Sequence, residues 1–176
     1  MKFLRAFIGC SLLVVPSGLW AQNVKAGYDH AANFSKFHTY TWTKGFPAAQ
    51  ERINSRIVAD TEQQLASRGL KRVEGEADLL VSYSAGVDQE FSYGPSMYVR
   101  GPNWGGFWAD WGPTSSSGVL KGQILVELVE PRSKQCVWRA LATDNISDSV
   151  RNNPDALMKK ISKMIEKIFS KFPERK

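Results

Sequence analysis

This chain of 176 residues has only two cysteines and two histidines for thiol or imidazole chemistry. Cys10 lies in an apolar stretch near the N-terminus, so Cys136 would have no disulfide partner once that stretch is removed. We interpret Cys136 as a small apolar residue on a strand rather than as a reactive thiol. The sequence also lacks an apolar run of about 20 residues, the length that a membrane-spanning helix requires.

Because cysteine and histidine are scarce, the sequence offers few catalytic or metal-binding patterns. His30 and His38 are the available imidazoles, and a metal site would require a third ligand such as Asp78, which the spacing does not indicate. Residues 115–117 are three serines, but no nucleophile-elbow motif or glycine-rich phosphate loop accompanies them. We therefore expect a protein that is not an enzyme, with no catalytic residues, no metal and no cofactor. A cryptic hydrolase is the weaker alternative.

The first 21 residues have the pattern of a secretory signal peptide. A basic start precedes a short apolar stretch, and Ala21 is a small residue at its exit. Cys10 lies inside the apolar stretch, where it is badly placed for lipid attachment, so we see no lipobox. Cleavage after Ala21 is expected, although Leu19 is larger than such sites prefer and leaves the bond itself open. The sequence thus predicts a periplasmic protein with a cleaved signal peptide.

Residues 22–176 are long enough for one domain with a real core. Loss of Lys2 and Arg5 with the signal peptide lowers the basic residues from 23 to 21 against 17 acidic ones, a net charge of +4. This mild surplus permits contact with an anionic surface without requiring it. Nucleic acid is not expected as a partner of an exported protein.

Residues 118–146 predict two long strands joined by a tight turn at 130–133, where Pro131 favours a turn conformation. In the first arm, one face carries Leu120, Ile124, Val126 and Leu128, and the other carries Lys121, Gln123 and Glu127. This alternation places one face on a core. The return arm also alternates, but the pattern does not decide whether the set that begins at Cys136 or the set that begins at Val137 faces inward.

Shorter strands are predicted at residues 24–28, 37–43 and 77–87 from alternation and from β-branched and aromatic content. A helix between the second and third of these strands favours a right-handed crossover that leaves the two strands parallel. The fold class that follows is α+β: a two-layer sandwich with a mixed, mainly antiparallel sheet of about five strands and two helices on one face.

Residues 48–68 predict the first helix, because apolar positions recur on one side at Ile53, Ile57 and Leu65. Gly69 follows the last turn, where a left-handed residue closes a Schellman-type stop. The second helix begins after the N-cap Asn153, with Pro154 at its first position, and ends before Pro173. Its apolar stripe indicates that it packs on the sheet.

Residues 88–117 form a segment rich in aromatic residues, glycine and proline that has neither helical nor strand periodicity, and we treat it as a loop insertion. Its aromatic side chains suit sugar rings, peptides or partner surfaces. The binding residues that we hypothesise here are Tyr93, Tyr98, Trp104, Phe107, Trp108 and Trp111. The alternatives are a disordered loop and a loop that folds back over the open face of the sheet.

Lysines follow the outer face expected for the last helix. Lys159, Lys163 and Lys167 would give this helix a weak contact with an anionic membrane surface. The alternative is an ordinary solvated helix face.

Short motifs along the chain resemble one known family. They are Phe34-Ser35, Thr39-Tyr40-Thr41-Trp42, Gly69-Leu70, Ala77-Asp78-Leu79-Leu80-Val81, Gly118, Leu128-Val129-Glu130, Val137-Trp138-Arg139 and Lys171-Phe172-Pro173. In this order they resemble the bacterial envelope family known as domain of unknown function 4136. The chain departs from that family by lacking a usable lipobox cysteine and by carrying Glu130 and Ala140 where aspartate and glycine are expected.

The resemblance implies an exported α/β domain and supplies no catalytic residues. Together with the residue patterns, it leads us to expect a non-enzymatic envelope protein that acts as a binding or envelope-maintenance module. Its partner would be an unknown envelope protein or glycan. A subunit of a larger envelope complex is the main alternative, and the oligomeric state stays open.

Overall fold

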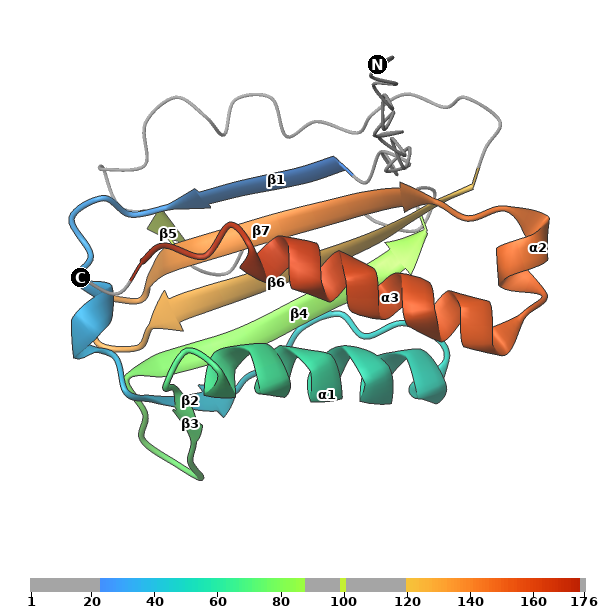
Figure 1. Cartoon of the computed structure of the whole chain (residues 1–176). Helices are drawn as coiled ribbons and strands as arrows, with labels where there is room; N and C mark the ends of the chain where they lie inside the picture. The colour runs from blue at the N-terminus through green and yellow to red at the C-terminus, as the bar shows by residue number, and fades with distance from the viewer. Residues whose placement is uncertain (1–22, 88–98, 101–119, 175–176) are drawn as a thin grey trace, which may run out of the picture.

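A computed structural model describes residues 23–87, 99–100 and 120–174. These residues form one sheet with helices packed against it (Figure 1). The strands are β1 (Asn23–Tyr28), β2 (Thr39–Trp42), β3 (Lys71–Arg72), β4 (Leu79–Val87), β5 (Val99–Arg100), β6 (Lys121–Glu130) and β7 (Gln135–Asn145). The helices are the 3-10 turn η1 (Phe34–Lys36), α1 (Glu51–Ala66), α2 (Asp148–Arg151) and α3 (Pro154–Phe169).

Six strands run side by side in the order β1-β7-β6-β4-β2-β3, and β5 pairs with β7 beside this path. The first four strands in this order, β1, β7, β6 and β4, are antiparallel to their neighbours. Strands β6 and β7 form the predicted long hairpin. By contrast, β2 and β4 are parallel, and α1 connects them. The α+β class, the mixed sheet and the parallel crossover are therefore confirmed.

The number of elements differs from the prediction. Within the described residues, the sheet has seven strands rather than about five, and a third helix, α2, follows β7. Strands β3 and β5 are two residues long, too short to show an alternating pattern. The second of them falls within residues 88–117, where no strand was expected. Helix α2 has only four residues, and Ser147 caps it by accepting a hydrogen bond from the Val150 amide.

Helix α1 begins later than predicted, at Glu51 rather than at Ala48. The buried side chain of Asn54 binds the Ala48 backbone, accepting from its amide at 2.8 Å and donating to its carbonyl at 3.0 Å. These bonds hold Ala48 beside the helix instead of within it. The other end agrees with the prediction, because Gly69 adopts φ 77° and the Leu70 amide donates to the Leu65 carbonyl at 3.1 Å.

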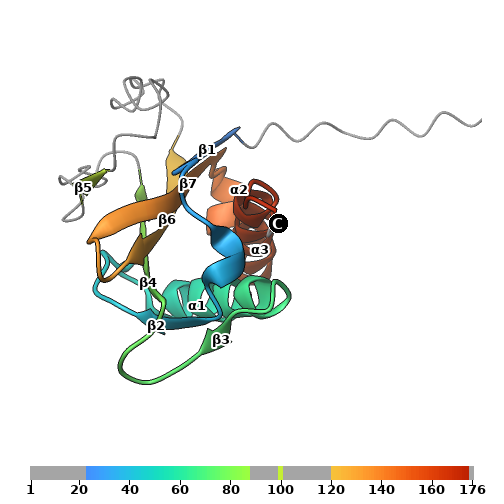
Figure 2. The same ribbon diagram turned by 90° about the vertical axis from the view of Figure 1, so that its left-hand side faces the viewer.

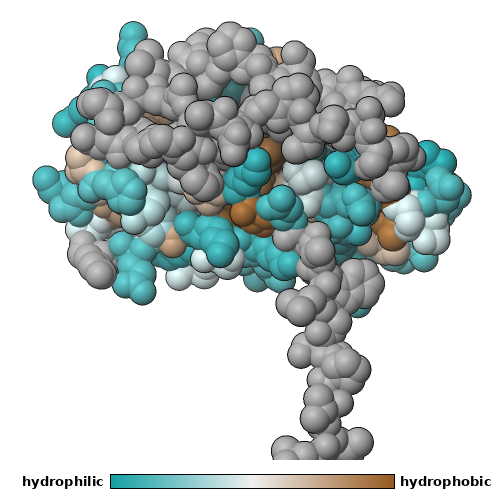
Figure 3. All heavy atoms as spheres, turned by 90° about the horizontal axis from the view of Figure 1, so that it is seen from above, coloured by the Kyte–Doolittle hydropathy of each residue, from teal (hydrophilic) through white to brown (hydrophobic). Residues whose placement is uncertain are grey.

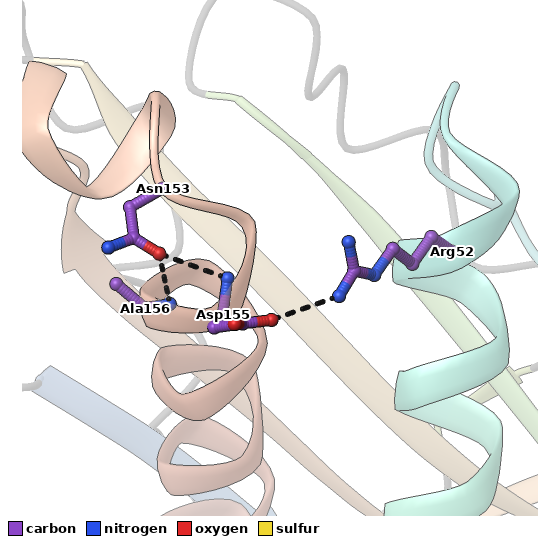
Figure 4. Close-up of polar contacts among 4 residues, drawn as sticks. All are labelled: Arg52, Asn153, Asp155 and Ala156. Atoms are coloured by element: carbon purple, nitrogen blue, oxygen red, sulfur yellow. Dashed lines mark hydrogen bonds and ion pairs between the residues drawn. The ribbon is translucent and has the colours of Figure 1, made fainter.

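Helix α3 begins as predicted at Pro154 (Figure 4). The Asn153 side chain accepts from the amides of Asp155 and Ala156, both at 3.1 Å, and so satisfies two donors that the first turn leaves unpaired. Asp155 reaches Arg52 on α1 at 3.2 Å, but both side chains are exposed. This ion pair is expected to add little to stability.

Both long helices cover the same face of the sheet, as predicted (Figures 1 and 2). Ile57 and Leu65 of α1 share one buried core with Ile161 and Ile168 of α3. Trp138 of β7 is fully buried in this core, and its ring centre lies 5.3 Å from that of Phe169. Apolar stripes on two helices thus bury against one face of one sheet.

A β-bulge answers the question that the return arm left open. Leu128 pairs with Trp138, but Val129 pairs with Cys136, so Val137 is an extra residue in β7. Trp138 and the alanines that alternate after it face the helices. Cys136 is displaced to the opposite face, beside Glu127 and Arg139, which influence its pKa.

That opposite face of the sheet is also buried. Gln123, Leu125 and Glu127 of β6 are between 2% and 9% exposed. Glu127 forms an ion pair with Arg139 on β7. The described helices all lie on the other face (Figure 2), so the burial here does not come from them.

Candidate functional site

A polar cleft of about 950 Å³ lies at the end of the sheet that carries the β6–β7 turn. Three connections surround it: the one after β1, the one between β3 and β4, and the turn itself. Its charged lining consists of Asp29, Lys36, Glu76, Asp78, Glu130 and Arg132. The volume is within the range of about 300–1,000 Å³ that is usual for ligand sites.

Asp29 is the most buried charged residue of the cleft, at 5% exposed. Its amide donates to the Val137 carbonyl at 2.8 Å, which continues the β1–β7 pairing by one residue. Its Oδ1 accepts from the Ala31 amide at 2.8 Å. No described residue donates a hydrogen bond to Oδ2. Asp29 is therefore a buried residue of the cleft lining whose carboxylate has one hydrogen-bond donor, the Ala31 amide, among the described residues.

Asp78 is bound from the neighbouring strand. Its Oδ2 accepts from the amides of His38 and Thr39 at 2.8 and 2.9 Å, and from the Thr39 hydroxyl at 3.0 Å. The bond from the His38 amide, followed by the bonds from Thr39, lowers the pKa of Asp78 because these donors stabilise the charged form. Asp78 thus fixes the start of β4 beside the start of β2.

Apolar residues form the rest of the cleft wall. Phe37 and Val137 are buried parts of the main core, and Leu80 is half-buried. Four carboxylates and two basic side chains line the cleft, whereas the whole chain carries a net charge of +6. The cleft is therefore negative on a protein that is positive.

Sequence reasoning did not find this cleft. Asp29 and Asp78 stood out only as single acidic residues, 49 positions apart in the printed sequence. They line one cleft because β1 and β4 both reach this end of the sheet, although two other strands separate them. No local motif carries that relationship, and only the strand order reveals it.

The aromatic binding hypothesis concerns residues outside the described part of the chain. Tyr93, Tyr98, Trp104, Phe107, Trp108 and Trp111 all lie there, as do the serines at 115–117. The structure therefore does not test this hypothesis.

The lysines of α3 separate into two groups. Lys159 and Lys163 are exposed and Lys167 is half-buried, in keeping with an outer helix face. Lys160 instead turns inward and forms an ion pair with Asp144 of β7 at 3.1 Å. The side chains of this pair are 17% and 11% exposed, so it connects α3 to the sheet rather than to a surface partner.

The groups suited to catalysis lie apart in different surroundings. His30 is exposed and its ring centre lies 4.4 Å from that of Tyr28, while His38 is exposed at the start of β2. Burial raises the pKa of the Cys136 thiol to about 12, which makes it a poor nucleophile. Within the described ranges, no three His, Cys, Asp or Glu side chains are grouped so that they could hold a metal ion.

On the face seen in Figure 3, the coloured side chains are mostly hydrophilic, with hydrophobic ones in small areas between them. Phe46 is the one large apolar side chain of the described residues that is strongly exposed, at 72%. None of the helices in this part of the chain has both the length and the apolar character to cross a membrane.

The fold and the cleft define a small α+β domain with one helix-covered sheet face and a polar cleft at one end of the sheet. The chain belongs to the family described as domain of unknown function DUF4136, whose model matches residues 24–174. This match confirms the resemblance that the sequence motifs indicated. A comparison with curated proteins found no match.

Two solved structures with TM-scores above 0.5 share the fold at low sequence identity. A DUF4136 family protein from Bacteroides thetaiotaomicron is 16% identical with a TM-score of 0.55, over 85% of this chain and 94% of that one. A PDZ domain protein from Parabacteroides distasonis is also 16% identical, with a TM-score of 0.56, over 87% of this chain and 36% of that one. A PelC dodecamer from Paraburkholderia phytofirmans is 13% identical with a TM-score of 0.49, over 85% and 95%.

Proposed function

We propose that this protein is an exported, non-enzymatic binding module of the bacterial envelope, and that the polar cleft at the turn end of the sheet holds its ligand. The observation that carries the proposal is the cleft itself, in which the carboxylate of the buried residue Asp29 has one donor, the Ala31 amide, among the described residues. The proposal commits to binding and assigns no reaction.

Two further features support binding rather than catalysis. The one described thiol, Cys136, is buried with its pKa raised to about 12. The carboxylates of the cleft are joined there by lysine and arginine, and neither His30 nor His38 belongs to the lining. A general base of suitable pKa at the cleft would most often be a histidine.

Export is a part of the proposal that rests on the sequence. The basic start, the apolar stretch and Ala21 support a secreted chain that begins near Gln22. An envelope location also agrees with a mature cysteine that needs no disulfide partner.

Site-specific photo-crosslinking in living cells tests the proposal. A benzophenone amino acid would replace Ala31, an exposed residue of the cleft, and, as the matched control, Ala66, an exposed residue at the end of α1. We expect a discrete crosslinked species in the envelope fraction from position 31 and none from position 66. No species from position 31, or the same species from both positions, would contradict a ligand in the cleft. The second outcome would favour a subunit of a larger complex.

A further inference from the structure

We propose that the cleft binds an extended peptide segment of a partner protein through a lysine or arginine side chain, with Asp29 as its main contact. This inference rests on the proposed function and names the chemistry of the ligand. It follows from the charge of the cleft, from the state of Asp29, and from the side chains of the lining.

Charge is the first step. Among the described residues of the lining, four carboxylates against two basic side chains give a surplus of two negative charges. Residues 22–176 carry a mildly positive net charge of +4, so the negative lining distinguishes the cleft from the chain as a whole. A cation would therefore bind because of the local charge of the cleft and not because of the net charge of the protein.

The state of Asp29 is the second step. Asp29 is only 5% exposed as a whole residue, so its carboxylate has limited contact with water and gains from any donor that reaches it. Its Oδ1 has the Ala31 amide, but its Oδ2 has no donor among the described residues. An ammonium or guanidinium group supplies such a donor, with the shorter and stronger geometry of a charge-assisted hydrogen bond.

The other lining residues favour a peptide over a glycan. Exposed aromatic rings offer the broad apolar faces that suit sugar rings, but among the described residues of the lining Phe37 is the one aromatic side chain, and it is only 8% exposed. Lys36 and Arg132, both exposed, add positive charge to the same cleft. The side chains of Lys36 and Arg132 can donate hydrogen bonds to the carbonyl oxygens and acidic side chains that neighbour a basic residue in a peptide.

Fluorescence anisotropy with the purified full chain tests the inference. The probe is a labelled hexapeptide with one lysine and one arginine, and its matched control carries acetyl-lysine and citrulline at the same positions. A glucosamine hexamer, which carries ammonium groups on a glycan, is tested as a competitor. We expect the basic peptide to bind at least tenfold more tightly than the neutral one, and the glucosamine hexamer to displace it poorly.

Asp29→Asn is the decisive variant, because it keeps the oxygen that accepts from the Ala31 amide and removes the charge. We expect it to weaken binding of the basic peptide at least tenfold while the unfolding midpoint stays within experimental error. Asp148→Asn is the control, since the Asp148 side chain is 83% exposed on α2 and outside the cleft. It should bind the peptide like the wild type.

Three results would overturn the inference. Equal affinity for the basic and neutral peptides would show that charge is not recognised. Unchanged binding by Asp29→Asn would place the contact elsewhere, and preferred binding of the glucosamine hexamer would make the ligand a glycan. Crosslinking from Ala31 would still succeed in each case if the cleft is a binding site, so the proposed function and this inference can fail separately.

Discussion

The guanidinium group of Arg68 donates a hydrogen bond of 2.7 Å to the carbonyl oxygen of Phe169 and lies 5.3 Å from the centre of its ring. This contact joins the second residue after α1 to the last residue of α3, 101 positions apart. Phe169 in turn packs on Trp138, so Arg68 covers the end of the core formed by the two helices and the sheet. Burial lowers the pKa of Arg68, in keeping with a partly desolvated charge.

Arg68→Ala should destabilise the fold, because it leaves the Phe169 carbonyl without its charged donor and exposes two aromatic rings. We expect a loss of about 1–3 kcal/mol in the free energy of unfolding, measured by urea denaturation. Arg52→Ala is the control, since its ion pair with Asp155 is exposed, and it should change stability by less than about 0.5 kcal/mol. Equal effects would mean that Arg68 is not a structural contact.

Thr61→Val should stabilise the protein. Thr61 is fully buried on the inner stripe of α1, and its hydroxyl has no hydrogen-bond partner in the described part of the chain. A methyl group of similar size removes a desolvated hydroxyl, so thermal and urea unfolding should show a gain of about 1 kcal/mol.

The same substitution at Thr39 should have the opposite sign. The Thr39 hydroxyl donates to Asp78 Oδ2 and accepts from the Asp78 amide, both at 3.0 Å. Thr39→Val would leave both groups without this partner and should cost about 1–2 kcal/mol. A gain at position 39 or a loss at position 61 would show that hydroxyl satisfaction does not decide these effects.

Asp78 should make stability depend on acid pH. Its pKa in the folded chain is lowered, so its contribution is fully present above the unfolded value of about 3.9 and is lost as the pH falls through the lower folded value. Asp78→Asn should lower stability at neutral pH and flatten the profile between about pH 5 and 2. Urea unfolding across this range measures both changes, and parallel profiles for the two proteins would refute the assignment.

Cys136 should resist modification until the protein unfolds. It is 1% exposed, and burial, followed by the charge of Glu127, raises its pKa to about 12. In a chain that starts at Gln22, so that Cys136 is the single thiol, an aromatic disulfide reagent at pH 8 should react slowly. The rate should rise with urea in parallel with unfolding. Rapid labelling in native buffer would show that this end of β7 opens locally.

Export predicts a defined N-terminus. Mass spectrometry of the protein from the periplasm should find a chain that starts near Gln22 and carries no lipid. An acylated N-terminus at Cys10 would contradict the interpretation of the first 21 residues, because a lipid-attachment cysteine becomes the first residue after cleavage.

The sequence by itself determined the elements whose cause is local. Alternation in residues 120–128 is enough for a strand with one buried face, and Asn153 with Pro154 is enough for a helix start, because each signal lies within a few residues. The shared core of the two helices also followed, since each has one apolar stripe and the long hairpin has one apolar face. Strands of two residues, such as Lys71–Arg72, could not be predicted because they are too short to show an alternation of apolar and polar residues.

Tertiary structure decided what depends on residues far apart. The bulge at Val137 turns Cys136 to the opposite face, and it is set by pairing with β6 rather than by the local pattern of β7. Lys160 turns inward because Asp144 lies opposite it on the sheet. The candidate site could be recognised only from the strand order, since Asp29 and Asp78 share one cleft because β1 ends and β4 begins at the same end of the sheet. Periodicity records which face a residue takes, and it contains no information on which distant residue stands beside it.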